Sequence, residues 1–207
     1  MKTNVLREGW LLGGALLLGA AAGVLHLQAE DSKQPAKKMD QKPQFEVQLP
    51  DEAWKQKLTL EQYAVARQAG TERPFGKVYQ EFEAQGEGDY HCVCCGVRLF
   101  TSKEKFHSGC GWPSFYDDSA DNNVLERVDD SHGMRRVETV CKRCGAHLGH
   151  VFDGESISAG TPTNRRFCIN GVAIVFVAKG EKPPPLLEPT SKEVKALKEK
   201  VAEGDKQ

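Results

Sequence analysis

The stretch YHCVCCGVRLF, residues 90–100, decides the fold when it is read together with ETVCKRCGAHLGH, residues 138–150. Each stretch contains one Cys-x-x-Cys-Gly unit. A tight turn brings the sulfurs at positions i and i+3 together, and the glycine after each pair can take the positive φ that this turn needs. Two such units are typical of a four-thiolate zinc site with metal–sulfur bonds of roughly 2.3 Å. The expected ligands of a structural Zn²⁺ are Cys92, Cys95, Cys141 and Cys144.

Disulfides are the alternative for these four cysteines, because an exported protein could form them. The spacing of the two units fits metal ligands and favours zinc. Cys94 adds an ambiguity, since CVCC also permits a pair of Cys92 with Cys94. The position of Gly96 makes Cys95 the better ligand, and we interpret Cys94 as a spare structural thiol.

Around these units the chain is rich in β-forming residues. From Tyr90 to Ala178, short β-prone runs alternate with turn residues, which predicts a mainly β domain. Upstream, residues 51–58 (DEAWKQKL) predict a short helix that an acidic residue opens. Thr59 and Gln62 have the spacing of a capping box, so a second helix should follow and end near Gly70.

The composition of the flanking segments predicts where this domain ends. Residues 30–50 are charged, contain Pro and lack apolar periodicity, which is typical of a flexible linker. We therefore expect the domain to cover residues 51–178. Residues 179–207 should form a Pro-rich linker and a charged tail, the latter an exposed helix or a frayed end.

The N-terminus resembles an export signal. Lys2 and Arg7 precede an apolar run at residues 10–27. Residues 1–29 are thus either a cleaved signal peptide or a retained membrane anchor, and both place the domain in a periplasmic or other extracytoplasmic compartment. The remaining composition is that of a soluble domain, with 39% hydrophobic and 28% charged residues among 207. The net charge of −1 and the lack of a basic stripe give no indication of a nucleic-acid partner, and we expect none.

Two further cysteines stand alone, Cys168 in RRFCING (residues 165–171) and Cys110 in FHSGCGWPSFYDD (residues 106–118). A buried cysteine often only fills space, whereas a cysteine beside arginines can be a reactive thiolate. In a strand, Arg166 and Cys168 would point to the same face and Arg165 to the other. The glycines on both sides of Cys110 suit a thiol that moves to meet a partner.

Several separate motifs in order, SGCGWPSF, HLGHVFDG and RFCIN together with the two Cys-x-x-Cys-Gly units, closely resemble the methionine-R-sulfoxide reductase B family. The resemblance covers about residues 51–178. It implies a mainly β, Mss4-like (β-tent) fold of curved antiparallel sheets, with short N-terminal helices and zinc on the side away from the active site. It also implies reduction of the R epimer of methionine sulfoxide in oxidised proteins by a monomer.

The resemblance carries roles to individual residues of this sequence. Cys168 corresponds to the nucleophile, and Cys110 to the resolving thiol that forms a disulfide with it after a sulfenic acid stage. A thioredoxin-like protein would then reduce the disulfide. His150 would orient or protonate the sulfoxide oxygen, with His147 beside it. Metal ligation is the alternative for these histidines, but the four cysteines already complete a tetrahedron.

The remaining assignments concern the substrate pocket. By resemblance Trp112, Phe167 and Asp153 would contact or support the substrate, with Trp112 packing on the methyl group and Asp153 holding a histidine. Asn170 would hydrogen-bond within the pocket, although Asn170–Gly171 also fits a hairpin turn. The chain departs from the family near Asp153, since it reads FDGES where FDDG is common.

Two other functions fit parts of the pattern. A zinc-stapled β domain could be a non-catalytic binding module, but such a module has no reason to retain Cys110 together with Cys168. A thiol–disulfide oxidoreductase would more often use a Cys-x-x-Cys pair for its redox chemistry. The two lone cysteines therefore favour the reductase.

Overall fold

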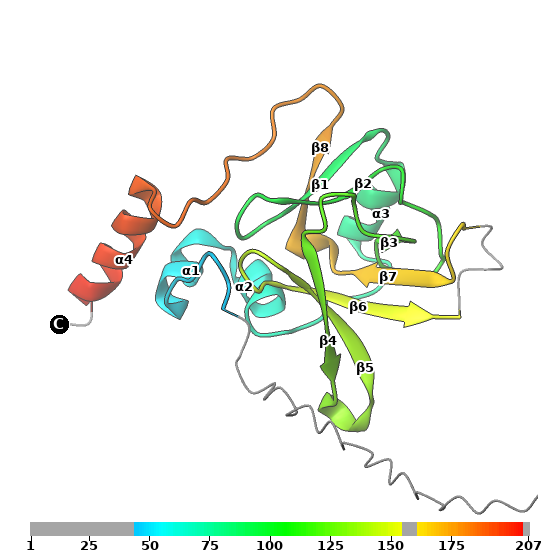
Figure 1. Ribbon diagram of the computed structural model, residues 1–207, viewed down its shortest axis with the longest axis horizontal. Helices are drawn as coiled ribbons and strands as arrows, with labels where there is room; N and C mark the ends of the chain where they lie inside the picture. Colours follow the sequence, from blue (N-terminus) through cyan, green and yellow to red (C-terminus); the bar gives the residue numbers. More distant parts are fainter. Residues whose placement is uncertain (1–43, 155–160, 205–207) are drawn as a thin grey trace, which may run out of the picture. The chain divides into compact units, whose positions relative to one another are not determined.

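The computed structural model describes residues 44–154 and 161–204, and two antiparallel sheets dominate these residues (Figure 1). The first sheet has the strand order β2–β1–β8, with β1 at Gly88–Cys92, β2 at Arg98–Thr101 and β8 at Ile174–Ala178. The second sheet has the strand order β3–β7–β6–β5–β4. Its strands are β3 (Ser114–Phe115), β7 (Arg165–Ile169), β6 (His147–Asp153), β5 (Arg136–Cys141) and β4 (Val124–Asp129). The predicted mainly β fold with antiparallel sheets is confirmed.

The strands agree with most of the β-prone runs, and two strands were not expected. β3 is only two residues long, and β4 is an edge strand whose residues 126–128 are exposed. The hairpin interpretation of Asn170–Gly171 is wrong. Asn170 precedes a 3₁₀ turn, η3 (Gly171–Ala173), that links β7 to β8, and these two strands lie in different sheets.

The five-stranded sheet turns one apolar face to the core. Directly opposed residues of an antiparallel sheet point to the same face, so the register defines rows of side chains across the strands. One row contains Val128, Val137, Val151, Phe167 and Phe115. Phe115 stacks on Phe100 of the other sheet with ring centroids 4.3 Å apart, and both rings are fully buried. The Phe115 end of this row is therefore part of the contact between the two sheets, whereas Val128 at its other end is exposed.

Three helices precede the sheets: α1 (Asp51–Lys57), α2 (Leu60–Ala66) and α3 (Lys77–Ala84). The predicted capping box is present, since the Thr59 hydroxyl accepts from the Gln62 N–H and the Gln62 side chain accepts from the Thr59 N–H. Helix α2 ends at Ala66, earlier than the expected stop near Gly70, and α3 was not predicted.

The packed domain extends beyond both predicted boundaries. Val47 is 1% exposed, although it lies in the segment expected to be a linker. Leu187 and Val194 are also buried, and helix α4 (Lys192–Gly204) packs against α1. Lys57 on α1 pairs with Glu193 on α4 at 2.6 Å. The tail is thus part of the domain and neither a free helix nor a frayed end.

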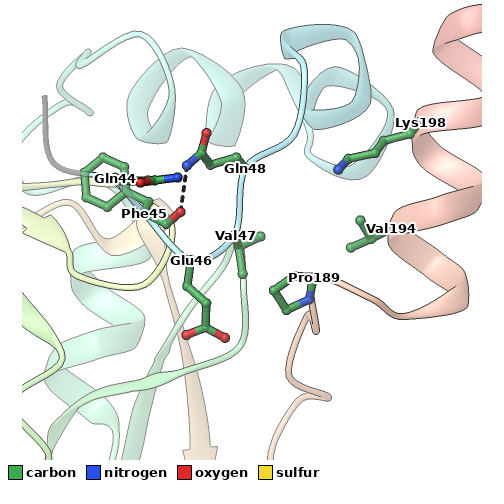
Figure 2. A pocket seen from close by; sticks show the side chains of 8 residues that line it. All are labelled: Gln44, Phe45, Glu46, Val47, Gln48, Pro189, Val194 and Lys198. Atoms are coloured by element: carbon green, nitrogen blue, oxygen red, sulfur yellow. Dashed lines mark hydrogen bonds between the residues drawn. The ribbon is translucent and has the colours of Figure 1, made fainter.

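A pocket lies between the first described residues and the start of α4 (Figure 2). Val47 and Val194 face it from opposite sides, and Pro189 and Lys198 contribute to its lining. The predicted signal or anchor at residues 1–29 lies outside the described residues. Within residues 44–154 and 161–204, no helix has both the length and the apolar character that a membrane span requires.

Candidate active site and metal centre

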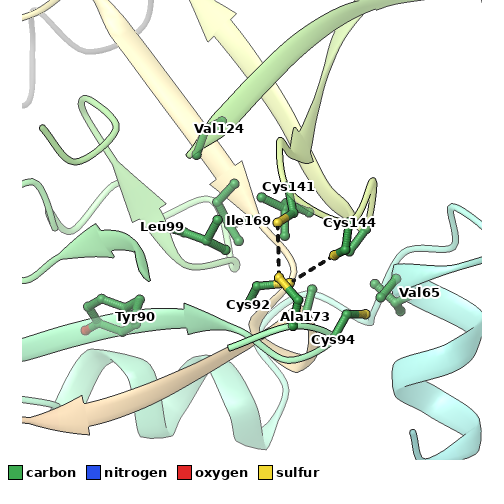
Figure 3. Packing of buried hydrophobic residues seen from close by; sticks show 14 of the residues in the cluster. Val65, Tyr90, Cys92, Cys94, Leu99, Val124, Cys141, Cys144, Ile169 and Ala173 are labelled. Atoms are coloured by element: carbon green, nitrogen blue, oxygen red, sulfur yellow. Dashed lines mark hydrogen bonds between the residues drawn. The ribbon is translucent and has the colours of Figure 1, made fainter. Parts of the chain in front are cut away.

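Four buried cysteines converge between the two sheets (Figure 3). The Sγ atoms of Cys92 and Cys144 are 3.7 Å apart, those of Cys95 and Cys141 are 3.6 Å apart, and all four lie within 4.8 Å of one another. A disulfide would need about 2.0 Å. A tetrahedron with bonds of about 2.3 Å to sulfur has edges of about 3.8 Å. The four thiols are therefore spaced to bind a metal ion.

The backbone around this cluster has the geometry that the sequence predicts. Gly96 and Gly145 have φ of 76° and 71°, and each donates its N–H to the carbonyl of the first cysteine of its unit at 2.8 Å. Cys94 is fully buried and is not one of the four converging residues. The C-terminal segment adds a contact here, because the Leu187 N–H donates to the Cys95 carbonyl at 3.0 Å. The tail therefore helps to hold the metal centre.

The other face of the five-stranded sheet carries the polar residues. One row across it contains a single residue from each strand: Arg127 on β4, Glu138 on β5, His150 on β6, Cys168 on β7 and Ser114 on β3. Since β7 lies between β3 and β6, Cys168 has a hydrogen-bonded strand on each side of it. Phe167 and Ile169, its neighbours in sequence, point to the core and are at most 1% exposed. The strand therefore holds the thiol on a rigid support.

Cys110 lies directly beside this thiol. Its Sγ is 3.7 Å from the Sγ of Cys168, so a disulfide requires an approach of only about 1.7 Å. The Ser108 hydroxyl donates to Cys110 Sγ at 3.0 Å, and the Ser114 hydroxyl is 3.5 Å from the same atom. The structure thus brings together the two lone cysteines that the sequence singled out, and it adds two serines that the sequence did not indicate.

The two thiols share a proton. Hydrogen bonds from Cys168, and then from Ser108 and Ser114, outweigh burial and lower the pKa of Cys110 to about 4. The same contact with Cys110 raises the pKa of Cys168, with burial acting in the same direction. Arg166 opposes this increase, because its charge and hydrogen bond lower the pKa of Cys168. Either sulfur can therefore donate to the other, and Arg166 is the positive group that favours the charge on Cys168.

The two arginines before Cys168 separate as the strand alternation predicts. Arg166 shares the face of Cys168, and its guanidinium lies 4.8 Å from the ring centroid of Phe152. Arg165 lies over the core residue Phe167 at 4.9 Å and pairs with Glu126 at 2.6 Å. Only Arg166 can therefore stabilise a charge on the candidate nucleophile.

Both histidines are held by carboxylates. His147 Nδ1 is 2.7 Å from Glu138 Oε1, and His150 Nε2 is 2.7 Å from Asp129 Oδ2. Burial opposes the charge on Glu138, but the hydrogen bonds of His147 and Arg127 hold its pKa at about 2. An ionised carboxylate only accepts, so each of these ring nitrogens carries a proton.

The hydrogen bonds to the two carboxylates fix the orientation of both imidazole rings in the site. Burial lowers the pKa of His150 although Asp129 acts in the opposite direction, so the ring is neutral near pH 7. The buried Nε2 of His147 has no hydrogen-bond partner among the described residues. The two rings lie 5.5 Å apart, edge to face.

Two predicted substrate residues lie elsewhere. Asp153 does not hold a histidine, because its side chain is 79% exposed and its ion pair is with Arg165 at 3.4 Å. Asp129 and Glu138 perform that task. Phe167 is 1% exposed on the core face, opposite Cys168, so its ring is a packing group that substrate cannot reach.

Trp112 and Asn170 meet around Glu72, a residue that the sequence did not indicate. The Trp112 indole donates from Nε1 to the Glu72 carbonyl at 3.1 Å, and Asn170 Oδ1 accepts from the Glu72 N–H at 3.0 Å. The amide nitrogen of Asn170 donates to the Leu148 carbonyl at 3.0 Å. Burial raises the pKa of Glu72, although hydrogen bonds from the backbone N–H groups of Gly171 and Val172 act in the opposite direction. Glu72 thus links Asn170, which follows the strand of Cys168, to the indole of Trp112.

Comparisons with known proteins show the family to which this domain belongs. The profile of the SelR domain family matches residues 58–178. A peptide methionine sulfoxide reductase MsrB of Chromohalobacter salexigens is 52% identical over 131 residues, which cover 63% of this chain and 94% of the relative. Proteins of the same name from Pseudomonas fluorescens (51% over 129 residues; 62% of this chain and 94% of the relative) and Methanosarcina barkeri (48% over 136 residues; 65% and 91%) are similar to it as well.

Proposed function

Because the chain belongs to the SelR domain family, we propose that the two adjacent thiols on the polar sheet face perform its chemistry. The chain is a peptide-methionine (R)-S-oxide reductase, an oxidoreductase that returns methionine-R-sulfoxide in oxidised proteins to methionine. The observation that supports the assignment of residues best is the 3.7 Å contact between the Sγ atoms of Cys110 and Cys168. This contact fits a nucleophile with its resolving partner.

The first step uses the proton that the two thiols share. Cys110 takes the proton of Cys168 across their contact, and Arg166 stabilises the Cys168 thiolate that results. This thiolate attacks the sulfoxide sulfur, and the oxygen passes to Cys168 while a proton from solvent reaches it through the ring nitrogens of His147 and His150. Methionine leaves, and Cys168 remains as a sulfenic acid. The methionine sulfur has gained the two electrons that Cys168 has lost.

The second step closes the disulfide. The Cys110 thiol attacks the sulfenic sulfur of Cys168, so that an S–S bond forms and water is released. An external dithiol then reduces this bond by thiol–disulfide exchange and restores both thiols. We propose a thioredoxin-like protein as the physiological donor, and a monomer as the acting form of the enzyme.

Three further assignments belong to this proposal. Zinc is the metal that suits four cysteine thiolates spaced as a tetrahedron, and it would hold the scaffold without entering the reaction. The N-terminal pattern of residues 1–29 supports export, either by a cleaved signal or by a retained anchor at residues 10–27. A reductant on the same side of the membrane would then be required.

The test compares the two epimers with dithiothreitol as reductant. A peptide that contains methionine-R-sulfoxide should be reduced, and the same peptide with the S epimer should not. Equal reduction of both epimers, or of neither, would refute the function. Cys168→Ser should abolish turnover, whereas Cys110→Ser should retain a single turnover and lose recycling by a dithiol protein. Normal recycling of Cys110→Ser would refute the disulfide step.

A further inference from the structure

A methionine occupies the turn of the hairpin formed by β4 and β5. The turn contains η1 (Ser131–Gly133), and Figure 1 shows it at the far end of the two strands. Residues 130–135 are all exposed, and Met134 is 50% exposed. The sequence has three methionines, and the other two, Met1 and Met39, lie outside the described residues. An apolar side chain at this position does not contribute to the core.

The same hairpin supports the catalytic face. The Met134 N–H donates to the Ser131 carbonyl at 3.1 Å, and the Ser131 N–H donates to Asp129 Oδ1 at 2.9 Å. Asp129 in turn binds His150 through its other carboxylate oxygen at 2.7 Å. Oxidation would convert the flexible apolar Met134 into a polar, chiral sulfoxide next to this hydrogen-bonded chain. The exposed Met134 side chain is therefore open to oxidants and to a partner, while its backbone belongs to this hydrogen-bonded chain.

The active site of the same molecule is out of reach of this methionine. Glu138, His150 and Cys168 follow one another across three adjacent strands, each about 4.8 Å from the next. Met134 lies four positions before Glu138, and strand residues rise about 3.4 Å each. The two offsets combine to roughly 17 Å between the backbones of Met134 and Cys168. Two short side chains cannot bridge this distance on a fixed hairpin.

We propose that Met134 is a site of reversible oxidation whose R-sulfoxide is reduced by the active site of a second copy of this chain. This inference rests on the proposed function. A peroxide transfers one oxygen atom to the Met134 thioether, so that the sulfur is oxidised by two electrons and the peroxide is reduced to water or an alcohol. Cys168 of the second copy then returns those two electrons by the steps given above, and a dithiol regenerates it.

The experiment separates substrate from catalyst. The Cys168→Ser chain is treated with hydrogen peroxide at a dose that leaves its metal bound, and the peroxide is then removed. The Met134→Leu chain is added as catalyst with dithiothreitol. Tryptic cleavage releases residues 128–135, VDDSHGMR, in which the one methionine reports the sulfoxide by mass. A free methionine-R-sulfoxide peptide in a parallel tube is the reference, and the Cys168→Ser chain as the added protein is the control catalyst.

The expected result is loss of roughly half of the Met134 sulfoxide, because peroxide gives both epimers and only one is a substrate. The rate should rise in proportion to the added Met134→Leu chain, and the control catalyst should cause no loss. If the reference peptide is reduced and Met134 sulfoxide persists, this inference fails and the proposed function stands. If the reference peptide also persists, the proposed function itself fails. Resistance of Met134 to a peroxide dose that oxidises a free methionine peptide would likewise overturn the inference.

Discussion

Glu138 is a buried carboxylate on which both stability and the site depend. It is 7% exposed, accepts from His147 Nδ1 at 2.7 Å and forms an ion pair with Arg127, whose Nη2 lies 3.1 Å from Oε1. Its pKa is held at about 2 against an ordinary value of 4.5. At about 1.4 kcal/mol per pKa unit, this difference corresponds to about 3 kcal/mol. Glu138→Gln should therefore lower the free energy of unfolding at pH 7 by about 2–3 kcal/mol.

The sign of the pH dependence follows from the lowered pKa. The contribution of Glu138 is complete above pH 4.5 and is lost as the pH falls through about 2, where the folded protein also takes up the proton. The difference between the native protein and Glu138→Gln should therefore shrink below pH 4.5. Metal release at low pH affects both proteins alike and cancels in this difference.

Urea denaturation followed by circular dichroism, from pH 7 down to the lowest pH at which both proteins are folded, measures these differences. Glu126→Gln is the matched control, because Glu126 lies on the neighbouring strand and pairs with Arg165, but its side chain is 39% exposed. An exposed pair contributes at most about 1 kcal/mol, so the control should lose less stability. Equal losses for the two variants at pH 7, or a Glu138→Gln difference that stays constant below pH 4.5, would refute the reasoning.

Three other substitutions test the scaffold. Cys92→Ser should lose the bound metal and most of the free energy of unfolding, since a structural zinc contributes about as much free energy as a whole domain has. Elemental analysis of Cys92→Ser, with Cys94→Ser as the control variant, measures the metal content, and an unchanged metal content in Cys92→Ser contradicts the prediction. Phe167→Ala should lower the free energy of unfolding, measured by urea denaturation, by about 3–5 kcal/mol, because its ring faces the core. Turnover per folded molecule should be retained, and loss of epimer selectivity would instead indicate a substrate contact. Leu187→Ala should cost about 2–4 kcal/mol, and a cost near zero would mean that the tail does not pack as described.

Local spacing was sufficient to predict the metal ligands. The geometry of a Cys-x-x-Cys-Gly turn depends on five consecutive residues, so Gly96 and Gly145 could be assigned a positive φ without knowledge of the fold. The face of Arg166 could be assigned for the same reason, since alternation along a strand is a local property. Cys110 and Cys168 were recognised by resemblance, and the structure supplies the distance between them.

The carboxylates that hold the histidines could not be predicted in this way. Asp129 and Glu138 reach His150 and His147 through the register of β4, β5 and β6, and the pairing of β5 with β6 is shifted by a bulge at Thr139/Val140. A one-residue change of register turns a side chain to the other face. The resemblance instead assigned this task to Asp153, whose side chain is 79% exposed.

The boundaries of the domain could not be predicted from composition either. Leu187 is a single apolar position in a Pro-rich stretch, and the apolar period of Val194, Leu197 and Val201 lies in a strongly charged tail, yet Leu187 and Val194 are buried. Composition describes the average character of a segment, whereas packing depends on where single apolar residues meet the core. A tail whose composition predicts exposure to solvent can therefore still pack as part of the domain.

The proposed roles of Cys168 as nucleophile and Cys110 as resolving thiol agree with the positions of the two residues in the fold. Cys168 lies on a central strand with hydrogen-bonded neighbours on both sides and buried residues before and after it, so its backbone cannot approach a partner. The approach of about 1.7 Å that the disulfide requires must come from Cys110. Gly109 has φ of 71° and open space where a Cβ would lie, whereas a Cβ on Gly111 would meet the ring of Phe75. The proposed roles, a nucleophile on a strand and a resolving thiol on a loop, fit this placement. Since Gly109 has a positive φ that other residues rarely adopt, a larger residue there should slow disulfide formation before it affects the attack on the sulfoxide.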